Sequence, residues 1–123
     1  MVEKPSVLIV DDEVRFCQHL GKEFGRRGWA PGSAHDGAAA LSSLSARRVD
    51  VMLLDIVLPG ESGVETLKRV RREHPRVRVI MLTGNAAVET AIECMKLGAV
   101  DYLSKPVNLA ELFVVVERAR EEG

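Results

Sequence analysis

The chain has 123 residues, a formal net charge of −1 at pH 7 and a hydrophobic fraction of 46%. This length suits one domain covering residues 1–123, and the apolar fraction is enough to build a buried core. A nearly neutral chain has no general attraction to nucleic acid or to anionic membranes, and no apolar run approaches the roughly 20 residues of a membrane span. The N-terminal residues lack a signal-peptide pattern, so we expect a cytoplasmic protein.

The first third of the chain predicts two strands, each followed by a helix. The apolar run at 6–10 is typical of a buried strand, and apolar residues then recur every fourth position, as in a helix: Phe16, Leu20 and Phe24. The run at 29–34 is a doubtful strand, because Pro31 and Gly32 belong at a sheet edge if they lie in a strand at all. A short helical pattern follows at 38–44.

The rest of the chain repeats this alternation three more times. Apolar runs at 51–54 and 77–82 predict strands, a weaker run lies at 101–104, and a short helix fits 64–72. Two longer patterns have the i, i+3, i+4, i+7 spacing of a helix: Val88, Ala91, Ile92 and Met95, and then Leu109, Leu112, Phe113 and Val116.

Five strand–helix pairs in succession indicate an α/β fold. Strands that alternate with helices of this length run parallel and are joined by right-handed crossovers. The middle strands lack the apolar–polar alternation of a half-exposed sheet, so helices should cover both of its faces. In such a doubly wound sheet, ligands bind in the crevice outside the carboxyl ends of the strands.

Polar residues follow four of the five predicted strands, at the edge where that crevice should lie. Crowded carboxylates repel one another, and a hard divalent cation relieves the repulsion. Oxygen ligands in an open site favour Mg²⁺, which shares its other positions with phosphate oxygens, and a carboxylate beside the ion can form an aspartyl phosphate. The residues, strand by strand, are Asp11–Asp12–Glu13, Asp55, Thr83–Gly84 and Ser104–Lys105–Pro106.

These strand ends carry a resemblance to a known family. The segments LIVDDE, VMLLDIVLPGESG, IMLTG and DYLSKP, in this order and spacing, closely resemble the receiver domain of two-component response regulators. The stretch AVETAIECMKLGAVDYLSKPV is further similar to receivers of nitrogen-regulatory-type transcriptional activators. The resemblance covers essentially the whole chain. It implies a flavodoxin-like (βα)5 fold with strand order 2-1-3-4-5, and an output domain elsewhere in a longer protein.

The resemblance also implies the chemistry of the site. Asp55 would accept a phosphoryl group from a sensor histidine kinase, and the domain would turn over no separate substrate. Asp12, Asp55 and the backbone carbonyl of Val57 would bind Mg²⁺ directly, and Asp11 would help through water. Phosphorylation would then control an output, of a transcriptional kind in the subfamily that this chain resembles.

Further positions match the residues that sense the phosphoryl group in this family. Thr83 would be the switch hydroxyl that bonds to it, and Lys105 would pair with one of its oxygens. The Lys105–Pro106 peptide bond would be cis, and Tyr102 would be the aromatic switch residue. Two simpler interpretations stay open, because Thr83 can also cap a helix and Tyr102 can also be an ordinary packing residue.

Two other classes of protein remain as alternatives. A phosphatase that forms an aspartyl phosphate, of the haloacid dehalogenase type, has a second aspartate two residues after its nucleophile, and here that position is Val57. A nucleotide- or flavin-binding module of similar topology has a glycine-rich loop after its first strand, and here that loop is Asp-Asp-Glu. Both alternatives therefore lack a residue pattern that they require.

The last helix suggests a surface for the output. Its inward face is already supplied by Leu109, Leu112, Phe113 and Val116. Val114 and Val115 are then left on flanks that a surface helix usually makes polar. We therefore predict a phosphorylation-enhanced homodimer through the fourth helix, the fifth strand and the fifth helix. The alternative is that Val114 and Val115 merely pack beside the fourth helix.

Overall fold

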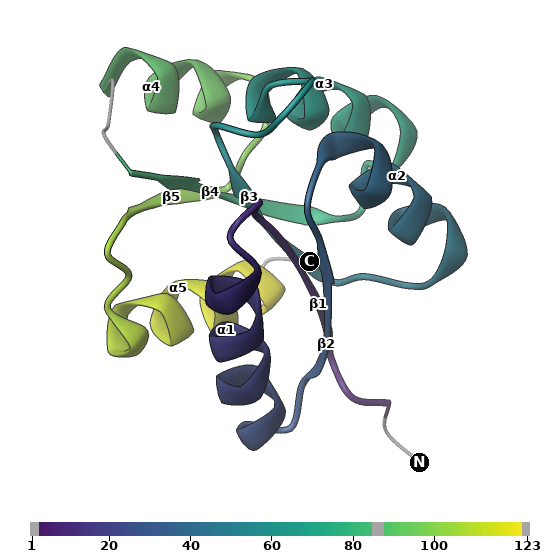
Figure 1. Ribbon diagram of the computed structural model, residues 1–123, viewed down its shortest axis with the longest axis vertical. Coiled ribbons are helices and arrows are strands. Elements are labelled where there is room, and N and C mark those ends of the chain that lie inside the picture. The colour runs from purple at the N-terminus through teal and green to yellow at the C-terminus, as the bar shows by residue number, and fades with distance from the viewer. Residues whose placement is uncertain (1–2, 85–87, 122–123) are drawn as a thin grey trace.

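The computed structural model describes residues 3–84 and 88–121, which form a five-stranded parallel sheet between two layers of helices (Figure 1). The strands lie in the order β2-β1-β3-β4-β5, and each neighbouring pair is parallel. The predicted fold class and strand order are therefore confirmed. The elements are β1 (Ser6–Val10), α1 (Val14–Arg26), β2 (Ala30–Ala34), α2 (Gly37–Ala46), β3 (Val51–Asp55), α3 (Gly63–Glu73), β4 (Arg78–Thr83), α4 (Val88–Lys96), β5 (Asp101–Ser104) and α5 (Leu109–Glu121).

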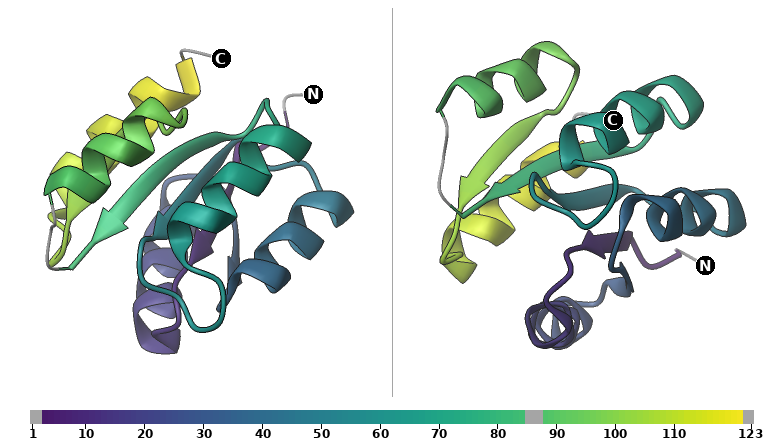
Figure 2. Two further views of the ribbon diagram at one scale, coloured as in Figure 1. Left: turned by 90° about the horizontal axis from the view of Figure 1, so that it is seen from above. Right: turned by 45° about the horizontal axis from the view of Figure 1, so that its top comes forward.

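Two apolar layers cover the two faces of the sheet. Helices α2, α3 and α4 lie on one face and α1 and α5 on the other (Figures 1 and 2). Successive residues of a strand point to opposite faces, so each central strand contributes to both layers. The first layer includes Leu8, Met52, Leu54, Val79 and Met81, and the second includes Val7, Ile9, Leu53, Ile80 and Leu82. None of the described helices is long and apolar enough to cross a membrane.

The doubtful strand at Pro31 and Gly32 exists, and it lies at an edge of the sheet. Pro31 stands opposite Val7 in the register of β2 with β1, and an edge strand tolerates proline because its outer side donates to no neighbour. Gly32 leaves room for the side chain of Arg47, since a Cβ at this position would lie 2.6 Å from Arg47 Nη1. The Arg47 guanidinium also donates to the carbonyl of Val7 at 3.1 Å.

Helix α4 is present, but its buried side differs from the apolar pattern that predicted it. Ala91 and Cys94 are buried, whereas Ile92 and Met95 of the predicted pattern are exposed. The helix lies against β4 and β5, beside the outer strand of the sheet. A narrow stripe of small side chains on α4 is therefore enough to cover this part of the sheet. The apolar residues left outside this stripe belong to the molecular surface.

The buried face of α5 is wider than the sequence pattern indicated. Val115, which was predicted to lie on an exposed flank, is only 6% exposed and packs in the same layer as Leu112 and Val116. The reason is that α5 lies across β3, β4 and β5, so the sheet covers a broad stripe of the helix. Val114 alone of the two valines is exposed, at 64%. The prediction for Val115 was therefore wrong.

Candidate functional site

Three aspartates meet at the carboxyl ends of β1 and β3. Asp11 and Asp12 directly follow β1, and Asp55 is the last residue of β3. One carboxylate oxygen of each lies within 4.8 Å of the others, with Asp11 and Asp55 buried and Asp12 exposed. Three hard oxygen donors with one open side fit a divalent cation such as Mg²⁺. The three carboxylates that the sequence predicted to hold the metal are thus brought together.

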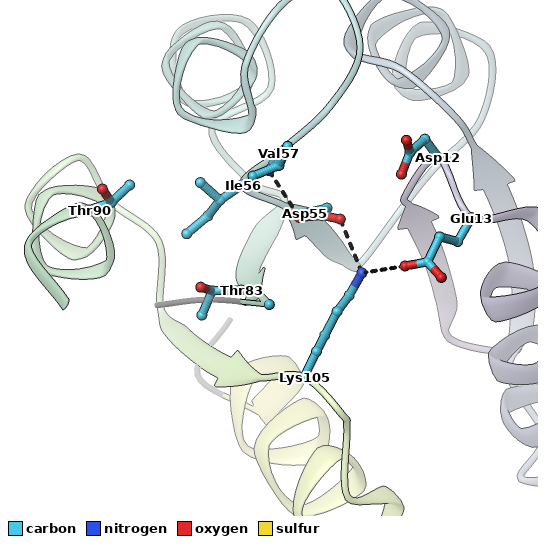
Figure 3. A pocket seen from close by; sticks show the side chains of 9 residues that line it. Asp12, Glu13, Asp55, Ile56, Val57, Thr83, Thr90 and Lys105 are labelled. Atoms are coloured by element: carbon cyan, nitrogen blue, oxygen red, sulfur yellow. Dashed lines mark hydrogen bonds and ion pairs between the residues drawn. The ribbon is translucent and has the colours of Figure 1, made fainter. Parts of the chain in front are cut away.

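Lys105 supplies a cation to this cluster from the end of β5. Its ammonium Nζ lies 2.5 Å from Asp11 Oδ2. It also lies 3.1 Å from Asp55 Oδ2 and 3.5 Å from Glu13 Oε1 (Figure 3). Burial alone would lower the pKa of the ammonium, but the hydrogen bonds to Asp11 and Asp55 outweigh it and raise the pKa. Lys105 is therefore charged at neutral pH, and it offsets only part of the negative charge around it.

The backbone fixes where the Lys105 side chain starts. Its amide N–H donates to the carbonyl of Thr83 at 2.8 Å, which ties the end of β5 to the end of β4. The Lys105–Pro106 peptide bond is cis, as the resemblance implied. Lys105 is thus held through its backbone by the neighbouring strand β4 and through its ammonium by the buried carboxylates of Asp11 and Asp55.

Asp55 combines burial with an accessible carboxylate. Burial raises the pKa of its carboxyl group, while the Val57 amide and the Lys105 ammonium act in the opposite direction. The Val57 N–H donates to Asp55 Oδ1 at 3.0 Å and holds the side chain toward the pocket (Figure 3). A carboxylate whose pKa is raised by burial is a stronger base than an ordinary aspartate, which suits a nucleophile.

Gly63 allows α3 to start directly against the backbone of Asp55. Its N–H donates to the carbonyl of Ile56 at 2.8 Å, and a Cβ at this position would lie 2.1 Å from the carbonyl oxygen of Asp55. Ser62 caps the helix, since its side chain accepts a hydrogen bond from the Glu65 N–H at 3.3 Å. Sequence reasoning assigned no role to Gly63, although a glycine between a strand-end aspartate and a helix is a recognisable signal of close approach.

A pocket of about 500 Å³ opens over Asp55. It brings together Asp12, Asp55, Thr83 and Lys105 of the predicted site, and Thr83 is buried at the end of β4. Figure 3 shows that these side chains come from four different strand ends. It also shows Thr90 of α4, a lining residue that sequence reasoning missed. Among the described residues, the lining consists of Asp12, Glu13, Asp55, Ile56, Val57, Thr83, Gly84, Thr90 and Lys105.

Two predicted residues lie at the margin of the site or outside it. Val57 lines the pocket and is largely exposed, and the role of its carbonyl as a metal ligand stays a prediction. Tyr102 is on β5, opposite Met81 of β4, with 41% of its surface exposed. It does not line the pocket over Asp55, and its role as a switch also stays a prediction.

A doubly wound parallel sheet with aspartates, a threonine and a lysine at its carboxyl edge defines a phospho-acceptor signalling domain. The family model of the response regulator receiver domain matches residues 7–117, and the chain belongs to that family. It is therefore a receiver domain of the two-component response regulators, as the four strand-end motifs predicted.

Individual relatives agree with the predicted subfamily. The chain is 39% identical over 118 residues to the nitrogen assimilation regulatory protein NtrX of Azorhizobium caulinodans, a match that covers 94% of this chain and 26% of that protein. It is similarly related to the regulatory protein AtoC of Escherichia coli, with 40% identity over 113 residues, 92% of this chain and 24% of that protein. The chain thus spans about a quarter of the length of these two relatives.

Solved structures show the same fold. The receiver domain of NtrX from Brucella abortus has a TM-score of 0.90 and 32% identity, covering 95% of this chain and 99% of that one. A response regulator from Burkholderia pseudomallei, whose structure contains a phosphorylated aspartic acid and a calcium ion, has a TM-score of 0.87 and 29% identity. That match covers 97% of this chain and 70% of the other.

Proposed function

We propose that Asp55 accepts a phosphoryl group from the phosphohistidine of a sensor histidine kinase, in a reaction that requires Mg²⁺. The observation that carries this proposal is the position of Asp55, a buried carboxylate at a pocket, with two aspartates within 4.8 Å and an ammonium at 3.1 Å. An Asp55 oxygen attacks the phosphorus as the P–N bond breaks, and the bonding electron pair leaves on the imidazole nitrogen, which takes up a proton. Since the kinase draws its phosphate from ATP, the transfer takes place in the cytoplasm.

Asp11, Asp12 and Asp55 would hold the Mg²⁺ ion, together with the backbone carbonyl of Val57. When bound, the ion supplies positive charge that neutralises the carboxylates and the phosphoryl oxygens during transfer. The number of hard oxygen donors in the cluster supports this assignment. The related Burkholderia pseudomallei regulator, whose structure contains a phosphorylated aspartic acid and a calcium ion, supports an aspartate as the acceptor in this domain.

Lys105 and Thr83 would bind the new phosphoryl group. The ammonium would exchange its contact with Asp55 Oδ2 for a phosphoryl oxygen, and the Thr83 hydroxyl would donate to another. No separate substrate is turned over, because the product is the modified domain itself. The domain would catalyse only its own phosphorylation and dephosphorylation.

The output surface would be formed by α4, β5 and α5. Movement of Thr83 toward the phosphoryl group would let Tyr102 turn inward and change this surface. Its exposed apolar residues support a second copy of the chain as the partner, in a transcriptional regulator of the NtrX and AtoC kind. They are Ile92, Met95, Tyr102 and Val114.

Small-molecule phosphorylation tests the role of Asp55. With Mg²⁺ and acetyl phosphate, the protein should gain one phosphoryl group by intact-mass spectrometry, and EDTA should prevent the gain. Asp55→Asn should take none. Asp101→Asn is a matched control, since Asp101 begins β5 at the opposite end of the sheet. Labelling of the Asp55 variant at the parental level would contradict the assignment.

Sedimentation with beryllofluoride, which mimics the phosphoryl group, tests the dimer. The parent should shift to twice its mass, and Val114→Glu should abolish the shift by burying a charge at the interface. Ala38→Glu adds the same charge to the exposed side of α2 and should leave the shift intact. A dimer that survives Val114→Glu would place the interface elsewhere.

A further inference from the structure

The Lys105 ammonium has an aromatic neighbour that neither metal binding nor phosphoryl transfer requires. Its Nζ lies 4.6 Å from the centroid of the Phe16 ring. Phe16 belongs to the stripe of α1 that the sequence predicted as core, but it differs from the other two members. Leu20 and Phe24 are fully buried, whereas Phe16 is half-buried at the end of the helix beside the site.

The other contacts of Lys105 indicate what the Phe16 ring contributes. Asp11 and Asp55 hold the ammonium in the described structure, and both are expected to turn to the metal ion and the phosphoryl group during transfer. Glu13 would then remain as a third carboxylate, 3.5 Å from Nζ, on a side chain that is 67% exposed. Figure 3 shows Glu13 and Asp55 on different sides of the ammonium, so Glu13 attracts it away from Asp55. The ring of Phe16 carries no ionisable or metal-binding group, so its attraction for the ammonium does not depend on what occupies the pocket.

We propose that Phe16 is a positioning residue for phosphoryl transfer: the face of its ring holds the Lys105 ammonium beside Asp55 against the pull of Glu13. This inference rests on the proposed function of Asp55. The transfer rate depends on the fraction of molecules in which the ammonium is in place. A cation–π contact of ordinary strength changes that fraction severalfold.

The location of the ring agrees with this role. Phe16, Glu13 and Lys105 line a second pocket, beside the one over Asp55, and Lys105 lines both. Glu13 also lines both pockets, whereas Asp55 lines only the first and Phe16 only the second. Without the ring, the second pocket would offer the ammonium a place to move to. Leucine at position 16 keeps apolar bulk but removes the π face.

The test is the initial rate of phosphorylation by acetyl phosphate at saturating Mg²⁺. Phe16→Leu should slow the reaction about three- to tenfold, the range set by a cation–π contact. Its Kd for Mg²⁺ should stay within about twofold of the parent, since Phe16 holds no metal ligand. Phe16→Tyr keeps the ring face and should restore most of the rate.

The chain offers a matched control for lost packing. Phe113 on α5 is also half-buried, and the Arg27 guanidinium lies 3.9 Å from its ring centroid. Phe113→Leu therefore removes the same kind of contact away from the site, and it should lower the melting temperature without changing the rate. A comparable loss of rate in this variant would show a general effect of packing and would overturn the proposal.

The role of Glu13 provides a second test. In the Phe16→Leu background, Glu13→Gln removes the competing carboxylate and should recover at least half of the lost rate. A double variant as slow as Phe16→Leu, or a Phe16→Leu variant as fast as the parent, would overturn the positioning role and leave Asp55 as the acceptor. A parent that takes no label at Asp55 would overturn both proposals.

Discussion

Replacing Lys105 with methionine would remove the ammonium that pairs with Asp11 and Asp55 while keeping a side chain of similar length. Both carboxylates are buried, so the change leaves them with backbone N–H donors but without the ammonium that partly offsets their charge. Two carboxylates of the aspartate cluster, whose oxygens lie within 4.8 Å of each other, repel each other by at least about 3 kcal/mol at an effective dielectric constant of ~20. Removal of one partner from a buried ion pair costs about 3–5 kcal/mol. We expect the free energy of unfolding without metal to fall by about 3 kcal/mol.

The same substitution should strengthen the binding of Mg²⁺. In the parent, the ion and the Lys105 ammonium compete for the oxygens of Asp11 and Asp55. If about half of the destabilisation is relieved by the ion, the gain is roughly 1.4 kcal/mol, or a tenfold lower Kd. Mg²⁺ should therefore raise the stability of Lys105→Met more than that of the parent, even though phosphoryl transfer becomes slower.

The dependence of this effect on pH follows from the raised pKa of Lys105. An ammonium whose pKa is raised by folding contributes its full stabilisation below its ordinary pKa of about 10.4, and the contribution is lost as the pH rises through the higher pKa of the folded state. The deficit of Lys105→Met should thus be complete at pH 7. It should shrink only in strong alkali.

Urea unfolding followed by the fluorescence of Trp29, the single and buried tryptophan, measures the stability with EDTA or with Mg²⁺. Calorimetry measures the Kd. Lys22→Met is the matched control, because Lys22 is an exposed lysine of α1. An unchanged stability without metal, or an unchanged Kd for Mg²⁺, would refute the view that the ammonium and the ion share the carboxylates.

Two further substitutions test how the fold holds Asp55. Asp55→Asn should raise the free energy of unfolding in EDTA at neutral pH. Burial raises the pKa of Asp55, so the ionised carboxylate of the parent lowers the stability of the folded state. In urea titrations the gain from Asp55→Asn should shrink as the pH falls through the raised pKa, because the parent carboxyl group then becomes protonated. Gly63→Ala should lower the free energy of unfolding by about 2 kcal/mol and weaken Mg²⁺ binding, because its Cβ would meet the carbonyl of Asp55 at 2.1 Å. Gly25→Ala, where a Cβ meets nothing within 4 Å, should instead add about 0.5–1 kcal/mol, and equal signs in the two urea curves would contradict this account.

The sheet and the cluster of polar residues at its edge were predictable because they depend on local patterns. Apolar runs such as 51–54 must be buried on both faces, and this requirement fixes a parallel sheet with helices on either side. Once the strands are parallel, residues that follow them, such as Asp55 and Lys105, must share one edge. Uncertainty in the strand register mattered little for this prediction. An error of one residue in the pairing of two strands would still leave these polar residues at the same edge of the sheet.

Contacts between distant side chains were not predictable in this way. The face of α5 that contains Val115 is buried because the helix lies across three strands, and a helical pattern alone does not reveal how much of its surface a sheet covers. Gly32 is required because Arg47 extends across the edge strand, which no local motif indicates. Likewise, the pattern of α1 identifies Phe16 as an apolar position but gives no sign that its ring faces Lys105.

The connections between strand ends suggest where a phosphoryl group would act. The Lys105 N–H donates a hydrogen bond to the Thr83 carbonyl, and Thr83 stands opposite Ser104 in the sheet. A displacement of the Thr83 or Lys105 side chain toward a phosphoryl group would therefore also move the paired ends of β4 and β5. Tyr102 lies on β5, two positions before Ser104. The neighbouring α4 is attached to the sheet by small buried residues, Ala91 and Cys94 among them, so shifting it exposes less apolar surface than shifting a helix held by larger side chains. Helix α3, by contrast, buries Leu67 and Val70. We therefore expect the few kcal/mol available from new charge-assisted hydrogen bonds to displace α4 and β5 while α3 stays in place.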